Sequence, residues 1–236
     1  MGHPRTEAGR PLTRVAADPR LVPWRGLDGG MMHQREPVLD PVRILDLRPT
    51  QMTVGMREVE AKRAHWRSVR RQEAGEFLGR HMVPVVLGPG RRHYIIDHHH
   101  LVLALHAEGV EAVLVTVVAN LARLDRESFW FFLDNSGMSH PYDADGVRQG
   151  PAAIPKSITG LIDDPYRSLA GELRRAGGFS KETTPFSEFL WADFLRRRIK
   201  RKRIEKSFQS ALEKALILAR SAEAGYLPGW CGPSSD

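Results

Sequence analysis

The stretch YIIDHHHLVLAL, residues 94–105, decides the fold. Its first three residues are aromatic or β-branched and predict a strand, whereas its last five are apolar and predict a buried helix. Four titratable residues stand at the junction: Asp97, His98, His99 and His100. Because aspartate is favoured at the residue that precedes a helix, we expect Asp97 to be the N-cap of this helix. The helix should end at Gly109, since glycine is favoured just after a helix.

The residues on either side of this junction predict further strands and helices. MVPVVLG (82–88) and HYIID (93–97) are strand-like, and the glycines and proline between them indicate a turn, so that the two strands should form a hairpin. Other elements are expected as strands at 42–47 and 111–121 and as helices at 54–69 and 126–137. This order of strands and helices is typical of a small α/β (α+β) domain with a mixed sheet.

The second half of the chain has the apolar spacing of helices. A helix is expected between Pro165 and Gly177, and residues 184–225 predict one or two long helices that continue beyond Ile204. Residues 1–38 are rich in Pro, Gly and Arg and predict a disordered tail. We therefore divide the chain into the tail at 1–38, an α/β domain at 39–140 and a helical C-terminal extension at 141–236.

The positive charge of the chain is concentrated in one segment. The chain carries 35 Lys and Arg against 28 Asp and Glu, a net charge of +7, and residues 196–206 (RRRIKRKRIEK) alone supply an excess of seven. Such a segment can contact nucleic-acid phosphates, and the alternative is that it forms a solvated face of a long helix. No aromatic residue interrupts it, so it does not indicate stacking on single strands. The residues expected to contact DNA are Arg197, Lys200, Arg201 and Arg203.

Cysteine content and hydropathy indicate the compartment. The one cysteine, Cys231, excludes an intrachain disulfide and a zinc site built from cysteines. The first residues carry no apolar signal segment, and no stretch is long enough to span a bilayer. We therefore expect a cytoplasmic protein that does not contact a membrane.

The histidine junction has the features of an anion site. A helix N-terminus leaves backbone N–H groups unpaired, and these groups attract phosphate. A metal site fits less well, because consecutive helical residues project about 100° apart and the three histidines cannot all reach one ion. Asp97 is the residue that could bind a divalent ion, with one histidine or with ligands from elsewhere. The alternative, given equal weight, is that one or two histidines only bond to nearby backbone.

Four blocks of the sequence carry a resemblance to a known family. They are the strand–D-x-H-H–helix turn after the hairpin PVVLG…YIID, and the blocks RPTQMTVGMREVEAKR (48–63), DDPYRSLAGELRR (163–175) and PFSEFLWADFLRRRI (185–199). Together they resemble the ParB/sulfiredoxin-like superfamily and, within it, the ParB-like nucleases. The resemblance implies a compact α/β fold whose strand–helix turn holds nucleotide phosphates. Relatives use this turn for CTP in partition proteins, for ATP in sulfiredoxins and for phosphotransfer in a free-serine kinase.

Carried over residue by residue, the resemblance implies catalytic roles at the turn. Asp97, His99 and His100 match the motif. A histidine would act as general base or phosphate donor, and Asp97 would orient it or bind one Mg²⁺ or Mn²⁺. The implied nucleotide is CTP or ATP. A histidine base with an ordinary pKa predicts a rate that rises between about pH 6 and 7.

The chain also departs from the pattern of these relatives. His98 stands where they have glycine, and Leu101 stands where many have the arginine that binds phosphate. Gln51 lies near the position of a glutamate in the kinase relatives, which argues against kinase chemistry. Lys62, on the preceding predicted helix, is the cation favoured to replace the missing arginine; unless the fold brings it over the pocket, it is a solvated lysine of that helix. The expected phosphate-binding residues are His98, His99, His100 and Lys62.

Three classes of function remain open from the sequence. The leading hypothesis is a protein that binds a nucleotide or nucleic-acid phosphate at the strand–helix turn, with nuclease or nucleotide-hydrolase activity implied by the resemblance. The alternative is a non-catalytic, partition-like DNA-binding adaptor that senses a nucleotide. The third is an interaction protein that forms a homo-oligomer through its long C-terminal helix.

Overall fold

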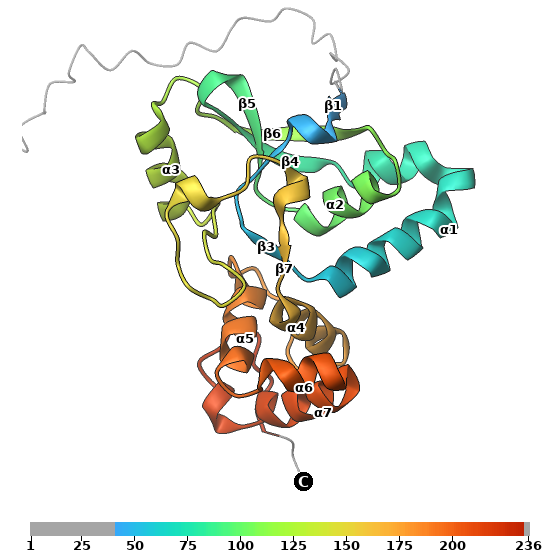
Figure 1. Ribbon diagram of the computed structural model, residues 1–236, viewed down its shortest axis with the longest axis vertical. Coiled ribbons are helices and arrows are strands. Elements are labelled where there is room, and N and C mark those ends of the chain that lie inside the picture. Colours follow the sequence, from blue (N-terminus) through green and yellow to red (C-terminus); the bar gives the residue numbers. More distant parts are fainter. Residues whose placement is uncertain (1–40, 234–236) are drawn as a thin grey trace, which may run out of the picture. The chain divides into compact units, whose positions relative to one another are not determined.

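A five-stranded mixed sheet organises the first half of the described residues, which are 41–233 of the computed structural model (Figure 1). Its strands, in order across the sheet, are β1 (Pro41–Arg43), β6 (Ala112–Asn120), β4 (Val83–Gly88), β5 (Arg92–Ile95) and β2 (Arg48–Pro49). β4 pairs antiparallel with β5 and parallel with β6, while β1 is antiparallel to β6 and β2 is parallel to β5. The predicted α/β (α+β) class is therefore confirmed. The tail predicted at 1–38 lies outside the described residues.

The hairpin and the helix after it form as the sequence predicts. The turn between β4 and β5 carries two successive positive φ angles, 70° at Gly90 and 55° at Arg91. Helix α2 (His99–Ala107) follows β5, and the chain leaves it through Gly109 with a φ of 79°. The positive φ explains the glycine, because residues with a Cβ rarely adopt it.

Helices cover both faces of this sheet. On one face, α1 (Met56–Arg80) and α2 pack over a core that includes Val85 and Ile95. On the other face, α3 (Arg126–Asn135) packs over a core that includes Val86. Neighbouring residues of β4 thus enter different cores, as the two-residue period of a strand requires. Figure 1 shows α1 beside α2, with α3 across the sheet from them.

The strand predicted at 42–47 is wrong. Residues 44–46 form a 3₁₀ turn that separates β1 from β2, and these two strands lie at opposite edges of the sheet. The turn allows Ile44 and Leu47, three residues apart, to be fully buried in the same core. The helix predicted at 54–69 begins at Met56, and α1 continues to Arg80 beyond a non-helical kink at Glu73.

A two-stranded parallel sheet connects this half to the C-terminal helices. β3 (Thr53–Val54) pairs with β7 (Ile162–Asp163), and the chain continues from β3 into α1 and from β7 into α4 (Pro165–Arg175) (Figure 1). The starts of α1 and α4 are consequently close together. Asp163 Oδ1, for example, accepts the N–H of Met56 at 2.9 Å.

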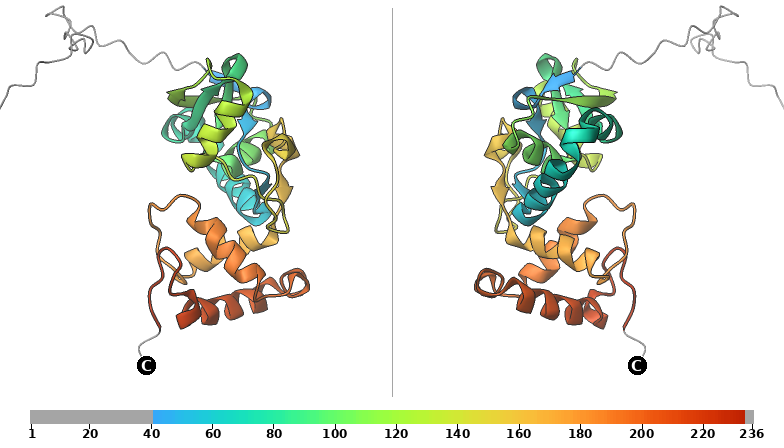
Figure 2. Two further views of the ribbon diagram at one scale, coloured as in Figure 1. Left: turned by 90° about the vertical axis from the view of Figure 1, so that its left-hand side faces the viewer. Right: turned by 90° about the vertical axis from the view of Figure 1, so that its right-hand side faces the viewer.

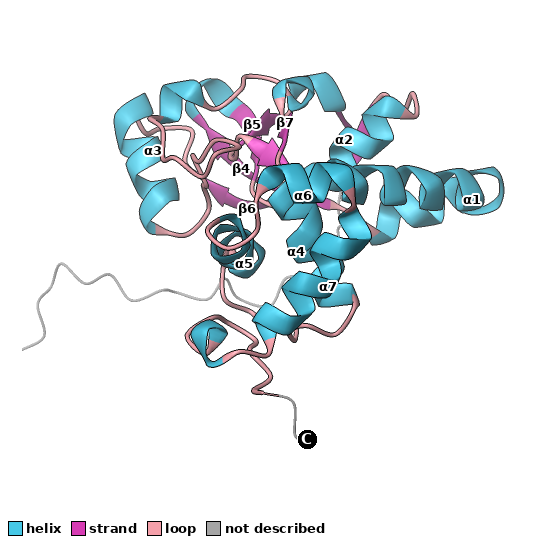
Figure 3. Ribbon diagram, turned by 60° about the horizontal axis from the view of Figure 1, so that its bottom comes forward, coloured by secondary structure: helices cyan, strands magenta, loops and turns pink. Residues whose placement is uncertain are grey.

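Among the described residues, four C-terminal helices lie together (Figures 2 and 3). They share a second hydrophobic core. They are α4, α5 (Ser187–Arg196), α6 (Arg201–Lys206) and α7 (Phe208–Ala219). The prediction of one or two long helices over 184–225 is therefore wrong. The backbone is extended at Lys200 and at Ser207, and the Ser207 side chain caps α7. These breaks allow Ile199 and Ile204 to be buried in the same core.

Short 3₁₀ turns complete the described chain. They are η1 (Ile44–Asp46), η2 (Pro89–Arg91), η3 (Pro151–Ala153), η4 (Ile158–Gly160) and η5 (Ala222–Ala224). Ile158 and Leu161 pack in the first core with α1 and α2, although they follow residue 141. The division of the chain into 39–140 and 141–236 stays a prediction. No helix in the described part of the chain is both long and apolar enough to cross a bilayer.

Candidate functional site

The strand–helix junction has a left-handed residue at its centre. His98, with φ 66° and ψ 19°, is the residue that precedes α2, and its side chain makes no capping bond. The expectation that Asp97 is the N-cap is therefore wrong. Asp97 lies one residue earlier, and its Oδ1 accepts the N–H of His98 at 2.6 Å. A left-handed backbone suits glycine, the residue that the family resemblance gives at this position.

The next two histidines bond to the backbone of another segment. His99 Nε2 accepts the N–H of Thr50 at 3.2 Å, and His100 Nε2 accepts the N–H of Gly55 at 3.0 Å. A ring nitrogen that accepts a hydrogen bond carries no proton of its own, so both rings are neutral in this arrangement. Burial is the main cause that lowers the pKa of each ring well below its usual range. These two histidines thus hold the segment between β2 and α1 against α2.

His98 differs from its two neighbours, because its ring bonds to no residue among 41–233. Its Nδ1 atom is buried and has no hydrogen-bond partner there. Burial lowers the pKa of this ring as well, although the negative charge of Asp97 acts to raise it. Of the three junction histidines, His98 is therefore the one whose ring makes no hydrogen bond to the described part of the chain.

The junction opens into a cleft of about 470 Å³, which we call the histidine cleft. Asp97, Lys62 and the three histidines all line it, so the structure brings together the residues predicted to bind phosphate. Lys62 Nζ lies 3.5 Å from Glu58 Oε1, at the same wall. Gln51 also lines the cleft, and its Nε2 donates to Thr53 O at 2.7 Å.

An arginine that the sequence reasoning missed also lines the histidine cleft. Arg167 lies in the first turn of α4 and is 6% exposed. Its guanidinium stacks on the Phe189 ring, with Cζ 3.3 Å from the ring centroid. Its Nε and Nη1 atoms are buried and have no hydrogen-bond partner within the described residues. Burial lowers the pKa of this guanidinium. A buried charge without hydrogen-bond partners is unusual and indicates a functional site.

Glu188, Asp164 and Glu58 oppose the charge of Arg167, but none of these carboxylates forms an ion pair or hydrogen bond with it. The pKa of His140 is lowered to about 3, mainly by burial and to a smaller extent by nearby positive charges that include Arg167. This ring is therefore uncharged. The two histidines of α2 that face Arg167 are neutral as well. Glu188 is the carboxylate that acts most strongly on Arg167, but it lies 3.0 Å from Arg174 Nε and makes no hydrogen bond to Arg167.

One signal in the sequence could have indicated the burial of Arg167. Ala170 and Gly171 lie three and four residues after it, which places them on the same face of α4. Small residues on one face of a helix allow another element to approach closely. An arginine at the head of such a face is then expected to be covered.

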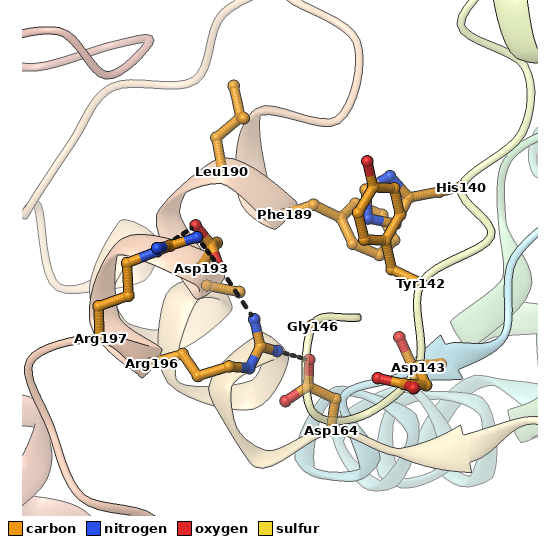
Figure 4. Close-up of a pocket in the computed structure, with 12 residues that line it drawn as sticks. His140, Tyr142, Asp143, Gly146, Asp164, Phe189, Leu190, Asp193, Arg196 and Arg197 are labelled. Atoms are coloured by element: carbon orange, nitrogen blue, oxygen red, sulfur yellow. Dashed lines mark hydrogen bonds and ion pairs between the residues drawn. The ribbon is translucent and has the colours of Figure 1, made fainter. Parts of the chain in front are cut away.

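A second, smaller pocket of about 270 Å³ shares Phe189 with the histidine cleft (Figure 4). The His140 ring lies against Phe189, with ring centroids 3.7 Å apart, and Tyr142 stacks on His140. On the opposite wall, Arg196 Nη2 donates to Asp164 Oδ2 at 2.5 Å (Figure 4). Phe189 therefore packs against the Arg167 guanidinium in the histidine cleft and against the His140 ring in the second pocket.

The comparisons with known proteins agree with this geometry. A family model described as "Putative ParB-like nuclease" matches residues 41–197. The chain belongs to this ParB-like family. Among solved structures, the crystal structure of protein Atu1540 from Agrobacterium tumefaciens is similar, with 54% identity and a TM-score of 0.78 over 83% of this chain and 97% of that one. A search of curated proteins finds no match.

The ParB-like chain contains no ready-made metal cluster in the part that the structure describes. Within residues 41–233, no group of three or more His, Cys, Asp or Glu side chains is arranged to hold an ion. An ion at Asp97 would therefore take its other ligands from water and from the phosphate itself, as Mg²⁺ commonly does. Metal binding at Asp97 stays a prediction.

The basic segment of the ParB-like chain does not line the histidine cleft. The four residues predicted to contact DNA are exposed at the end of α5 and on or beside α6: Arg197, Lys200, Arg201 and Arg203. Two of them are paired, Arg197 with Asp193 and Arg201 with Glu205, each at 2.9 Å. Lys200 and Arg203 have no ion pair among the described residues.

Proposed function

We propose that this ParB-like protein binds a phosphate of a nucleotide or nucleic acid in the histidine cleft, with Arg167 as the main cationic ligand. The observation that carries the proposal is the buried guanidinium with two unpartnered nitrogens. Arginine binds phosphate through paired N–H donors, which makes a phosphate a fitting partner. Arg167 would then replace the motif arginine for which this chain has Leu101, with Lys62 adding a second cation.

The backbone of α2 supports the same ligand. The N–H groups of His99, His100 and Leu101 make no hydrogen bond within residues 41–233. Free N–H groups at a helix N-terminus attract anions. An anion in the cleft can therefore meet helix N–H groups, a guanidinium and the ring of His98 at once. CTP and ATP, each with one Mg²⁺ or Mn²⁺, are the nucleotides that the family suggests.

Phosphodiester or nucleotide hydrolysis is the second candidate function, favoured by the family match and by the unpartnered ring of His98. The predicted bases His99 and His100 use their Nε2 atoms on backbone N–H groups, so they are less suited to accept a proton from water. His98 is the better general base. Because burial lowers its pKa, activity that depends on neutral His98 should persist to a lower pH than an ordinary histidine base would allow.

The proposal is tested by replacing Arg167 with a neutral residue of similar length. R167M should abolish the thermal stabilisation by CTP, ATP, ADP or GTP, each with and without Mg²⁺ or Mn²⁺. A true ligand at a hundredfold excess over its Kd should stabilise the wild type by about 2.7 kcal/mol. R175M is the matched control, since Arg175 lies on the same helix, is already paired with Glu172 and Glu58, and does not itself line the cleft.

Stability separates a ligand role from a structural role. If Arg167 serves the ligand, R167M should melt at the same or a higher temperature, because it removes a buried charge without hydrogen-bonded partners. A large loss of stability together with unchanged nucleotide stabilisation would make Arg167 structural and overturn the proposal. So would a wild type that no nucleotide stabilises.

The hypothesis that this protein binds DNA rests on the basic segment at 196–206 and on the family match. The exposed cations at the end of α5 and on α6 can contact duplex phosphates. The partition-like adaptor combines this contact with nucleotide binding in the cleft. Cytoplasmic location and a homo-oligomer stay predictions, and the single long helix expected to mediate the oligomer is replaced by three shorter ones.

A further inference from the structure

A separate basic pocket of about 310 Å³ lies outside the histidine cleft and shares no lining residue with it. Its four cations come from four different segments of the chain: Arg48 of β2, Arg92 of β5, Arg126 of α3 and Lys156 of the loop after η3. Aromatic rings of Tyr94 and Trp130 line the same space. Neither the proposed nucleotide site nor the basic segment at 196–206 includes any of these residues.

The charge of this basic pocket is not compensated locally. No aspartate or glutamate lines it, and none of its four cations forms an ion pair with another residue of 41–233. The histidine cleft differs in this respect, because Glu58, Asp97, Glu182 and Glu188 line it together with its cations. A concave, one-signed surface attracts anions more strongly than a mixed one.

Contacts between neighbouring segments hold the walls of the basic pocket together. Arg48 Nη1 donates to the backbone oxygen of Lys156 at 2.7 Å, which holds the Arg48 guanidinium against the segment that carries Lys156. The rings of Tyr94 and Trp130 meet edge to face, with centroids 5.6 Å apart. Arg91, with its positive φ of 55°, turns the hairpin immediately before Arg92. Strained backbone of this kind clusters at functional sites.

We propose that the basic pocket binds a segment of single-stranded nucleic acid. Its phosphates would contact the four cations, and one base would pack on the aromatic and proline walls. The volume suits about one nucleotide, near the lower end of ordinary ligand pockets. A duplex cannot insert a nucleotide into such a concave space, because its bases are paired and stacked inside. The assignment is independent of the phosphate site at Arg167.

The test measures binding of fluorescent oligonucleotides by anisotropy at several salt concentrations. The pocket variant replaces Arg48, Arg92, Arg126 and Lys156 by Gln. Its matched control replaces Arg43, Arg70, Arg71 and Arg123 by Gln, which removes the same charge from exposed positions that line none of the described pockets. A triple variant that keeps Arg48 preserves its bond to Lys156 O, in case the fourfold variant does not fold.

We expect the pocket variants to bind a single-stranded oligonucleotide about tenfold more weakly than the control variant does. The slope of log K against log salt should flatten by about 0.7 for each lost contact. Duplex binding should change equally in pocket and control variants. Nucleotide stabilisation through Arg167 should persist, so the two proposals can fail separately. Equal loss of single-strand binding in pocket and control variants, or a loss specific to duplex, would overturn the assignment.

Discussion

At the scale of the residue, His98 holds a left-handed backbone at the strand–helix junction. Its φ of 66° is a conformation that costs a residue with a Cβ about 1–2 kcal/mol. The substitution H98G should therefore give a protein about 1 kcal/mol more stable than H98A, although alanine is the better residue in most other places. Urea unfolding of the two variants measures the difference. A more stable H98A would mean that the turn is not left-handed.

Three neutral histidines make stability depend on pH. The pKa of His140 is lowered to about 3, and those of His99 and His100 lie well below their usual range, all chiefly through burial. Above about pH 6.5, the folded and unfolded forms of these groups are both neutral and stability is complete. As the pH falls below that value, the unfolded chain binds protons that the folded chain does not, and stability is lost.

Replacing one of these histidines should remove its share of that loss. Each histidine that stays neutral in the folded state lowers the free energy of unfolding by about 1.4 kcal/mol for each pH unit of acidification between its unfolded and its folded pKa. H140F keeps an aromatic ring beside Phe189 but cannot be protonated. Measured by urea unfolding between pH 7.5 and 4.5, the free energy of unfolding should fall less steeply for H140F than for the wild type. Parallel curves would show that His140 is protonated in the folded protein.

At the scale of elements, Gly55 decides how closely α1 approaches α4. A Cβ added at Gly55 would lie 2.7 Å from the backbone nitrogen of Ser168, which cannot move without shifting α4. G55A should therefore destabilise the protein by about 1–3 kcal/mol and disturb the N–H that His100 accepts. G75A, within α1 but with open space around it, should instead stabilise by about 0.5–1 kcal/mol. Thermal unfolding of both variants tests the contrast, and equal effects would contradict it.

The elements that the sequence predicted well are those with a strong local signal. The β4–β5 hairpin, α2, β6 and α3 have clear period-two or apolar patterns bounded by turn residues. The C-terminal helices were predicted as too long because no Gly or Pro marks the breaks at Lys200 and Ser207. Those breaks depend on the burial of Ile199 and Ile204 in one core, which is a tertiary effect.

The candidate site was predictable in part for the same reason. The junction residues follow from the local order of strand, titratable residues and helix. Arg167 is harder to predict, since α4 also carries Arg174 and Arg175, and the small residues Ala170 and Gly171 are a weak local signal that distinguishes it from them. Its burial arises only when Phe189 of α5 packs over the guanidinium. The ring nitrogens of His99 and His100 are likewise engaged by Thr50 and Gly55, which are distant in sequence.

At the scale of the whole molecule, the described chain carries three separate surfaces that present cations: the mixed-charge histidine cleft, the basic pocket and the exposed segment of α5 and α6. They differ in how their charges are satisfied. Arg167 is buried without a partner, the basic pocket is concave and holds no acid, and the segment at 196–206 is exposed and partly paired. These differences favour a phosphate, a single strand and a duplex respectively, and each can be tested by itself.

The exposed segment can be tested with two double variants of equal charge. K200Q/R203Q removes cations without an ion pair among the described residues, whereas R197Q/R201Q removes cations held by Asp193 and Glu205. A paired cation must give up part of its ion pair to meet a phosphate, so the first variant should weaken duplex DNA binding more. It should also flatten the slope of log K against log salt by about 0.9 for each lost contact, up to about 1.8.

Duplex anisotropy titrations across a range of salt concentrations measure both quantities, and melting temperatures verify that the variants fold. Equal weakening in the two variants would mean that only total charge matters and that no defined contact surface exists. A wild type that binds no duplex even at low salt would make the segment a solvated face. The adaptor hypothesis would then lose its DNA contact, while the phosphate site at Arg167 would stand or fall on its own measurement.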